Sequence, residues 1–243
     1  MNSIEDIKNV FYINLEHRID RKQHVETQLE SIGLKGTRFN AIKMENGAIG
    51  CSMSHLKLLQ LALKSGLDHI LIVEDDILFL DPDLFRSQLD LFLQKQASRS
   101  WDVLLIAGNN MPPYEKVDDT CVKVTHCQTT TGYLVNGHYI EKLLNNVKMG
   151  LTNLIKDPEN RFQYAIDMHW FSLQKVDNWF LITPLTVVQR EDYSDIEKKV
   201  INYQKAMTDL DKMEIIKKIK EHDEKQQKYQ EMMSKFKERM NII

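Results

Sequence analysis

Three consecutive carboxylates, Glu74, Asp75 and Asp76, follow an aliphatic run that begins at Ile70. An unbroken aliphatic run is typical of a strand buried on both faces of a sheet. Three acids beyond such a strand cannot all be buried without partners, because desolvation and mutual repulsion would be severe. We therefore expect them at the carboxyl edge of the sheet, holding Mg²⁺ or Mn²⁺ and, through the ion, a phosphate-bearing substrate. The alternative is an exposed acidic turn after a strand.

A second group of polar residues follows the first predicted strand. Asn14 lies near the end of that strand, and Arg18 and Arg21 come soon after it. In a doubly wound fold this place touches a nucleotide or its phosphates, and arginine is a good bidentate partner for a diphosphate. Taken alone, the pattern fits a helix N-terminus with solvated charges better.

The third group lies late in the chain, where Asp167, His169 and Trp170 fall close together. Asp167 can deprotonate a hydroxyl, and His169 can bind a metal through its neutral imidazole. Trp170 can stack on a sugar face. The alternative is a partly buried helix whose acid caps its own start.

Residues 47–55 are rich in glycine and serine, which predicts a turn and an N-cap before a helix that begins at Ser52. His55 would then lie in the first helical turn, where free backbone N–H groups can bind an anion. The alternative is a structural histidine. The threonines of 129–131 can line a sugar pocket, but threonine is also simply a good strand former.

Alternating strands and helices must position these side chains. The pattern predicts strands at 9–15, 37–42, 69–73, 102–107, 121–124, 129–135 and 179–188. It predicts helices at 20–32, 52–64, from 81 or 82 to 92, 137–147 and 163–173. Such alternation is typical of an α/β fold with a mostly parallel sheet flanked by helices.

Composition limits the function classes. The 243 residues carry a net charge of only -3 and no dominant basic block, which gives no support for nucleic-acid binding. The three cysteines are too few and too irregular for a disulfide scaffold, so we expect free thiols. Residues 1–6 do not resemble a signal peptide, and no apolar stretch is long enough to span a bilayer. We expect a cytoplasmic protein, either free or peripheral to a membrane.

The composition changes near residue 195, where charged residues become dominant. We predict one domain over 1–195 and a tail of one or two amphipathic helices over 196–243. Such a tail would pack on its own domain or pair with a second copy as a homo-oligomer. Membrane-surface binding is a weaker alternative, because the polar face carries many acids.

Taken together and in order, these motifs resemble glycosyltransferase family 25, which includes bacterial lipopolysaccharide sugar transferases and collagen galactosyltransferases. The resemblance spans roughly the first 195 residues. The residues that carry it are Tyr12 to Leu15 with Arg18, Asp20 and Arg21, Phe39 to Ala41, Gly47, Ile49 to Cys51, Ser54, His55, Glu74 to Asp76, Thr131 to Tyr133, Asp167, Pro184 to Gln189 and Ser194 to Ile196.

The resemblance implies a GT-A-like domain that uses a UDP-sugar and Mn²⁺ and transfers a hexose with inversion. It places Asp76 on the metal, and Glu74 or Asp75 near the metal or the donor ribose. Asn14, Arg18 and Arg21 would hold the nucleotide end, and His55 would also face the donor. Asp167 matches an acid of the family.

The sequence leaves several alternatives open. The donor sugar is galactose or glucose, and the acceptor is a glycan, a lipid-linked glycan or a hydroxylated protein side chain. A metal-dependent phosphoesterase would use the same acids, although a second cluster of metal ligands is missing from the sequence pattern. A degenerate transferase domain could act as a binding or assembly module through its tail.

Overall fold

The computed structural model describes residues 1–95, 100–194 and 199–239. The chain divides into two compact units, Met1–Leu210 and Asp211–Ile243. The first unit contains all the candidate site residues. Each unit is described by itself.

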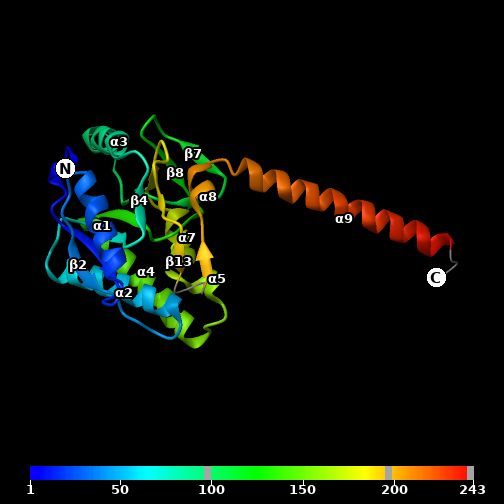
Figure 1. The fold of residues 1–243 in the computed structure, drawn as a ribbon, viewed down its shortest axis with the longest axis horizontal. Coiled ribbons are helices and arrows are strands. Elements are labelled where there is room, and N and C mark those ends of the chain that lie inside the picture. Colours follow the sequence, from blue (N-terminus) through cyan, green and yellow to red (C-terminus); the bar gives the residue numbers. More distant parts are fainter. Residues whose placement is uncertain (96–99, 195–198, 240–243) are drawn as a thin grey trace. The chain divides into compact units, whose positions relative to one another are not determined.

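The core of the first unit is an eight-stranded mixed sheet (Figure 1). Its order is β2-β1-β3-β10-β5-β11-β8-β7, and only β10 and β8 run against the other six strands. The sheet is therefore mostly parallel in direction. Its strands are β1 (Val10–Asn14), β2 (Thr37–Asn40), β3 (His69–Glu74), β5 (Val103–Leu105), β7 (Tyr114–Lys116), β8 (Cys121–Val124), β10 (Gly132–Asn136) and β11 (Trp179–Ile182).

Helices cover both faces of this sheet. One apolar core joins α1 and α3 to one set of strand side chains, and a second core joins α2 and α4 to the alternate set. On β3, for example, Leu71 and Val73 lie in the first core, while Ile70 and Ile72 lie in the second. The helices are α1 (Ile19–Ser31), α2 (Gly47–Lys64), α3 (Pro82–Gln94) and α4 (Ile140–Lys156). The expected α/β class, with a mostly parallel sheet flanked by helices and a C-terminal helical extension, is confirmed.

Three short antiparallel pairs of strands lie outside the main sheet. The pairs join β4 (Ile77–Phe79) to β12 (Val187–Gln189), β6 (Asn109–Asn110) to β9 (Cys127–Gln128), and β13 (Asp192–Ser194) to β14 (Lys199–Ile201). Because β4 begins directly after Asp76, the acids form the short turn that connects the main sheet to the β4–β12 pair.

Helix α2 begins earlier than its sequence pattern predicts. Asn46 accepts hydrogen bonds from the N–H groups of Ala48 and Ile49, so the helix begins at Gly47 rather than at Ser52. The expectation that residues 47–51 form a turn, with His55 in the first turn of the helix, is therefore wrong. His55 lies deeper in the helix, beyond its free backbone N–H groups.

Two other predicted elements are divided. The helix expected at 163–173 is three short helices, α5 (Arg161–Tyr164), α6 (Ile166–His169) and α7 (Phe171–Gln174). The strand expected at 179–188 is split between β11 of the main sheet and β12, because β12 pairs with β4 instead.

The first unit continues past the boundary expected at residues 195 and 196, which themselves lie outside the described residues. Beyond them, β14 pairs with β13, and α8 (Gln204–Thr208) buries Met207 completely. The second unit consists mainly of the long helix α9 (Met213–Arg239). Among the described helices, none combines the length and the apolar character needed to cross a membrane.

Candidate active site

The three acids lie at the end of β3, beside the end of β1. Glu74 is the last residue of β3 and pairs in register with Ile13 of β1, which brings Asn14 next to Asp75. Asp75 and Asp76 form the turn into β4. Because β1 and β3 are parallel, their carboxyl ends meet at one edge of the sheet, as the sequence predicts.

Asp75 is a buried structural partner for two other candidate residues. Its carboxylate accepts hydrogen bonds from Asn14 Nδ2 at 2.8 Å and from Arg21 Nη1 at 2.9 Å. The other side of Asn14 accepts from Arg38 Nε at 2.9 Å, which fixes the amide orientation. Burial raises the pKa of Asp75, and Arg21 opposes that rise. Removing Arg21 would leave the Asp75 charge uncompensated, and removing Asn14 would cost it a buried hydrogen bond, so Asp75 ties α1 and β1 to the acidic turn.

Asp76 is only half satisfied. Its Oδ2 lies 3.3 Å from Arg21 Nη1 and 3.5 Å from Gln189 Nε2, but its Oδ1 is buried without a hydrogen-bond partner. Burial, followed by the negative charge of Glu74, raises the pKa of Asp76 to about 7. A buried carboxylate oxygen without a partner is costly, and a bound cation would remove that cost. The residues at this position therefore fit a hard divalent cation such as Mn²⁺ or Mg²⁺.

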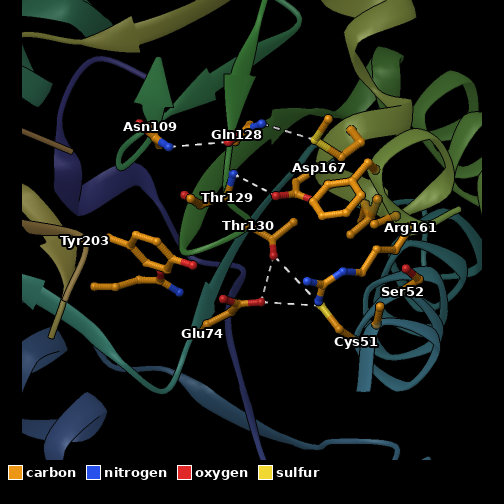
Figure 2. A pocket seen from close by; sticks show the side chains of 16 residues that line it. Cys51, Ser52, Glu74, Asn109, Gln128, Thr129, Thr130, Arg161, Asp167 and Tyr203 are labelled. Atoms are coloured by element: carbon orange, nitrogen blue, oxygen red, sulfur yellow. Dashed lines mark hydrogen bonds between the residues drawn. The ribbon is translucent and has the colours of Figure 1, made fainter. Parts of the chain in front are cut away.

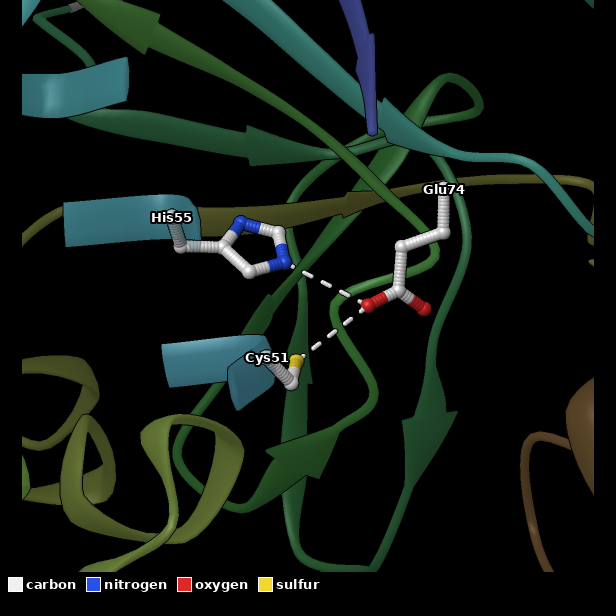
Figure 3. Close-up of side chains that lie close together, drawn as sticks. All are labelled: Cys51, His55 and Glu74. Atoms are coloured by element: carbon white, nitrogen blue, oxygen red, sulfur yellow. Dashed lines mark hydrogen bonds and ion pairs between the residues drawn. The ribbon is translucent and has the colours of Figure 1, made fainter. Parts of the chain in front are cut away.

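Glu74 is held by Cys51 and His55 of α2 (Figure 3) and by Thr130, which precedes β10. Its Oε1 accepts from Thr130 Oγ1 at 2.7 Å and lies 3.3 Å from His55 Nε2 and 3.6 Å from Cys51 Sγ. His55 Nδ1 lies 2.7 Å from the Tyr133 hydroxyl, so the imidazole is held at both nitrogens. Burial alone would raise the pKa of Glu74, but the hydrogen bond with His55 and the other donors lower it. These contacts keep Glu74 ionised and fix its orientation.

Cys51, His55 and Glu74 also place three potential metal ligands within 4.8 Å of one another. A sulfur, nitrogen and oxygen set suits zinc better than manganese. These atoms already satisfy one another by hydrogen bonding, and burial raises the pKa of the Cys51 thiol well above its usual value. The unpartnered oxygen of Asp76 is therefore the better candidate for a hard cation.

Three arginines gather around Asp192 of β13. Asp192 Oδ2 lies 3.1 Å from Arg18 Nη2, 3.1 Å from Arg21 Nε and 2.6 Å from Arg190 Nη2. Burial would raise the pKa of Asp192, but hydrogen bonds from Arg190 and the Tyr193 N–H hold it well below its usual range. The contacts hold Arg18 and Arg21 in defined positions close to the acidic turn.

Asp167 approaches the acids from α6. Its Oδ2 accepts a hydrogen bond from the backbone N–H of Thr129 at 3.2 Å, and Thr129 adopts a left-handed φ of 76°. Burial raises the pKa of Asp167, although the Thr129 N–H opposes the rise. A buried carboxylate with a raised pKa is a suitable general base near neutral pH.

Two cavities meet at the acids, and they share Cys51, Glu74 and Gln189. The Asp76 cavity has a volume of about 350 Å³ and is lined by Asp75, Asp76, Arg18, Arg21 and the 41–45 segment, among others. The Asp167 cavity, shown in Figure 2, has a volume of about 260 Å³. Its other lining residues include Asn109, Gln128, Thr129, Thr130, Arg161, Phe162 and Tyr203. Glu74 thus lies between the cavity of Asp76, Arg18 and Arg21 and the cavity of Asp167.

The structure does not bring every predicted site residue to these cavities. His169 packs against α4, where a Cβ added to Gly150 would lie 2.9 Å from its ring, and it is absent from the described lining of both cavities. The expectation that Trp170 stacks on a sugar is wrong, because Trp170 is fully buried against Tyr133 and Trp179. Asn14 and His55 lie behind the cavity walls, where they orient Asp75 and Glu74.

Sequence reasoning missed several lining residues. Gln189 directly follows a predicted strand, as the acids do, but its place beside Asp76 depends on the pairing of β12 with β4. Thr130 was ambiguous because threonine also favours strands. Nothing in the local sequence distinguishes Asn109 or Phe162, whose places at the Asp167 cavity depend on contacts between distant segments.

Comparison with known proteins bears directly on this arrangement. Residues 43–154 match the family model described as glycosyltransferase family 25 (LPS biosynthesis protein). The resemblance to glycosyltransferase family 25 is confirmed. The segment that matches family 25 contains the acidic triad and His55, whereas Asn14, the arginines and Asp167 lie outside it.

Curated relatives agree with the family match. A glycosyltransferase 25 family member of Drosophila pseudoobscura pseudoobscura is 25% identical over 170 residues, which is 57% of this chain and 27% of that protein. Procollagen galactosyltransferase 1 of Danio rerio is 24% identical over 170 residues, which is 56% of this chain and 28% of that protein. The match to each relative thus spans only about a quarter of its length.

Solved structures give weak likenesses. A glycosyltransferase involved in the glycosylation of the major capsid of PBCV-1 aligns with a TM-score of 0.42 and 10% identity, over 83% of this chain and 88% of that one. A Drosophila β1,4-galactosyltransferase 7 mutant in complex with manganese, UDP-Gal and xylobiose aligns with a TM-score of 0.32 and 17% identity, over 56% and 52%.

Proposed function

We propose that this chain is a metal-dependent hexosyltransferase that moves a sugar from a UDP-sugar to an acceptor hydroxyl with inversion. The similarity to family 25 glycosyltransferases supports the reaction class. The observation that carries the proposal is the unpartnered, buried Oδ1 of Asp76 at a cavity that also holds Arg18 and Arg21.

In this proposal the Asp76 cavity binds the donor. Arg18 and Arg21 bind the diphosphate, and Asp76, with Glu74 nearby, holds Mn²⁺ or Mg²⁺. When bound, the ion stabilises the negative charge that develops on the leaving diphosphate. Asp75 and Asn14 keep Arg21 and the acidic turn in place.

The Asp167 cavity binds the acceptor in this proposal. Asp167 takes the proton from the acceptor hydroxyl while that oxygen forms a bond to the anomeric carbon and the bond from that carbon to the diphosphate breaks. Inversion requires the base and the leaving group on opposite faces of the sugar. The two cavities meet at Glu74, which supports a donor sugar placed between them.

The finer assignments are also proposals. Galactose is the first donor sugar to test, because one relative is called a procollagen galactosyltransferase, and glucose is the second. Glycans, lipid-linked glycans and hydroxylated protein side chains are the acceptor classes. A cytoplasmic location, free or peripheral to a membrane, stays a prediction.

A screen of UDP-sugars with Mn²⁺ tests the proposal. We expect at least one UDP-sugar to raise the melting temperature in the presence of Mn²⁺, and chelation of the metal to remove the rise. The same sugar nucleotide should be hydrolysed slowly to UDP and free sugar. Failure of every UDP-sugar to stabilise the protein would contradict the proposal, and release of inorganic phosphate would indicate a phosphoesterase.

A further inference from the structure

An exposed aromatic ring lies at the Asp167 cavity. Phe162, in α5, is 71% exposed although it lines the same cavity as the buried Asp167 carboxylate. The Arg161 guanidinium lies 5.0 Å from the centre of the Phe162 ring, a cation–π contact that restrains the ring. A single exposed phenylalanine is ordinary on a protein surface. Whether Phe162 binds a ligand must therefore be judged from the other residues that line the cavity.

The same cavity is also lined by a pair of side-chain amides. Asn109 Nδ2 donates to Gln128 Oε1 at 3.3 Å, and Gln128 Nε2 in turn contacts Met168 Sδ at 3.2 Å (Figure 2). This arrangement leaves Asn109 Oδ1 buried without a hydrogen-bond partner. A carbonyl oxygen in this state is an acceptor for a hydroxyl donor on a ligand.

A pyranose ring has one surface that complements an aromatic ring and another that complements an amide oxygen. Its C–H face is apolar and packs on an aromatic ring, while its equatorial hydroxyls donate to amide oxygens and one of them can give its proton to a base. A linear hydroxylated side chain offers a hydroxyl but no ring face for Phe162. The cavity volume of about 260 Å³ suits a small occupant such as one sugar residue.

We propose that the Asp167 cavity is a subsite for a pyranose of a saccharide acceptor, which packs on Phe162 and donates a hydrogen bond to Asn109 Oδ1. The assignment of the bound sugar as acceptor rests on the proposed transferase function. Binding of the pyranose itself does not.

The test measures binding and transfer separately. Saturation-transfer NMR reports binding of the methyl glycosides of galactose, glucose and N-acetylglucosamine, in the presence and absence of UDP and Mn²⁺. We expect at least one glycoside to bind the full chain, and Phe162→Ala to weaken its binding by about tenfold. Phe162→Trp should retain binding. Val176→Ala, which changes another exposed apolar residue outside both cavities, is the matched control.

Kinetics then separate this inference from the function on which it rests. With an active donor, Phe162→Ala should raise the acceptor KM by about tenfold, whereas Val176→Ala should leave both the acceptor KM and the hydrolysis of the donor by water unchanged. Equal glycoside binding by wild type and Phe162→Ala, or no binding to either, would overturn the subsite. Transfer to a hydroxylysine peptide but to no saccharide would also overturn it. Glycoside binding without any donor hydrolysis would support the subsite and count against the transferase.

Discussion

At the residue scale, Asp76 places function and stability in conflict. The Asp76 carboxylate contacts Arg21 and Gln189 through one oxygen, while the other oxygen is buried without a partner. Buried polar atoms in this state are rare in folded proteins and concentrate at functional positions. Asp75, by contrast, satisfies its neighbours and has a structural role. The sequence pattern could predict the acidic site, but it could not predict how these two adjacent acids divide the roles.

Asp76→Asn should change the pH dependence of stability in the metal-free protein. Folding raises the pKa of Asp76 from an ordinary 3.8 to about 7, so the unfolded chain loses this proton at lower pH than the folded chain. The contribution of Asp76 to folding stability is therefore greatest below pH 4 and is lost as the pH rises to about 7. The variant, relative to wild type, should be more stable at pH 8 than at pH 5.

Urea unfolding at the two pH values measures this difference. Asp76→Asn removes the charge but keeps the shape of the side chain, so circular dichroism should show the same fold. A difference in unfolding free energy between variant and wild type that does not change with pH would show that Asp76 titrates normally in the folded protein.

Asp167→Asn should separate transfer from donor binding. The asparagine keeps the shape of Asp167 but cannot take a proton, so the rate of transfer should fall by at least about a hundredfold. The Mn²⁺-dependent stabilisation by the UDP-sugar should stay, because Asp167 does not line the Asp76 cavity. Full transfer activity in the variant would exclude Asp167 as the base, and loss of donor binding would show that its effect is structural.

At the element scale, periodicity was sufficient where an element has one buried face or is wholly buried. Strand β3 and helix α1 are close to their predicted bounds for this reason. Residues 47–51 were misjudged because glycine and serine favour turns, whereas here Asn46 caps the helix and Gly50 allows close packing. The insertion of β10 between β3 and β5 could not be predicted, because strand pairing depends on contacts between distant segments.

Gly50→Ala should disturb the donor cavity through an element contact. An added Cβ would lie 2.5 Å from the backbone oxygen of Ile42, in the segment that lines the Asp76 cavity. Ser54 also anchors this segment, since its Oγ accepts from the Ile42 N–H at 2.9 Å. We expect a loss of about 1–3 kcal/mol in the free energy of unfolding and a raised KM for the donor.

Leu61→Ala is the control for this change, because Leu61 lies on the same helix with 44% exposure. Its effect on stability should be within about 0.5 kcal/mol. If Gly50→Ala and Leu61→Ala have equal donor KM values, the 41–45 segment does not shape the donor site.

At the scale of the whole molecule, the change in composition predicted a second unit that begins at residue 196. In the structure the second unit begins at Asp211, and β14 and α8 belong to the first unit. The apolar stripe of α9 remains exposed within its own unit at Met213, Tyr229 and Met232. Pairing of this stripe with a second copy stays a prediction. The weaker alternative, in which the tail binds a membrane surface, also stays a prediction.

Removal of residues 211–243 should leave the first unit folded, because the core residues that the structure describes in that unit all precede residue 211. The shortened chain should keep the donor-dependent rise in melting temperature. If the full chain self-associates in light scattering, the shortened chain should be monomeric. Loss of donor binding in a folded, shortened chain would show that the second unit contributes to the site.

The most direct test is the position of manganese and UDP in crystals, located by anomalous scattering at the manganese edge. We predict Mn²⁺ within coordination distance of the Asp76 carboxylate, with the diphosphate of UDP between the ion and Arg18 or Arg21. Mn²⁺ bound only at Cys51 and His55, or UDP bound outside the Asp76 cavity, would contradict the proposed donor site.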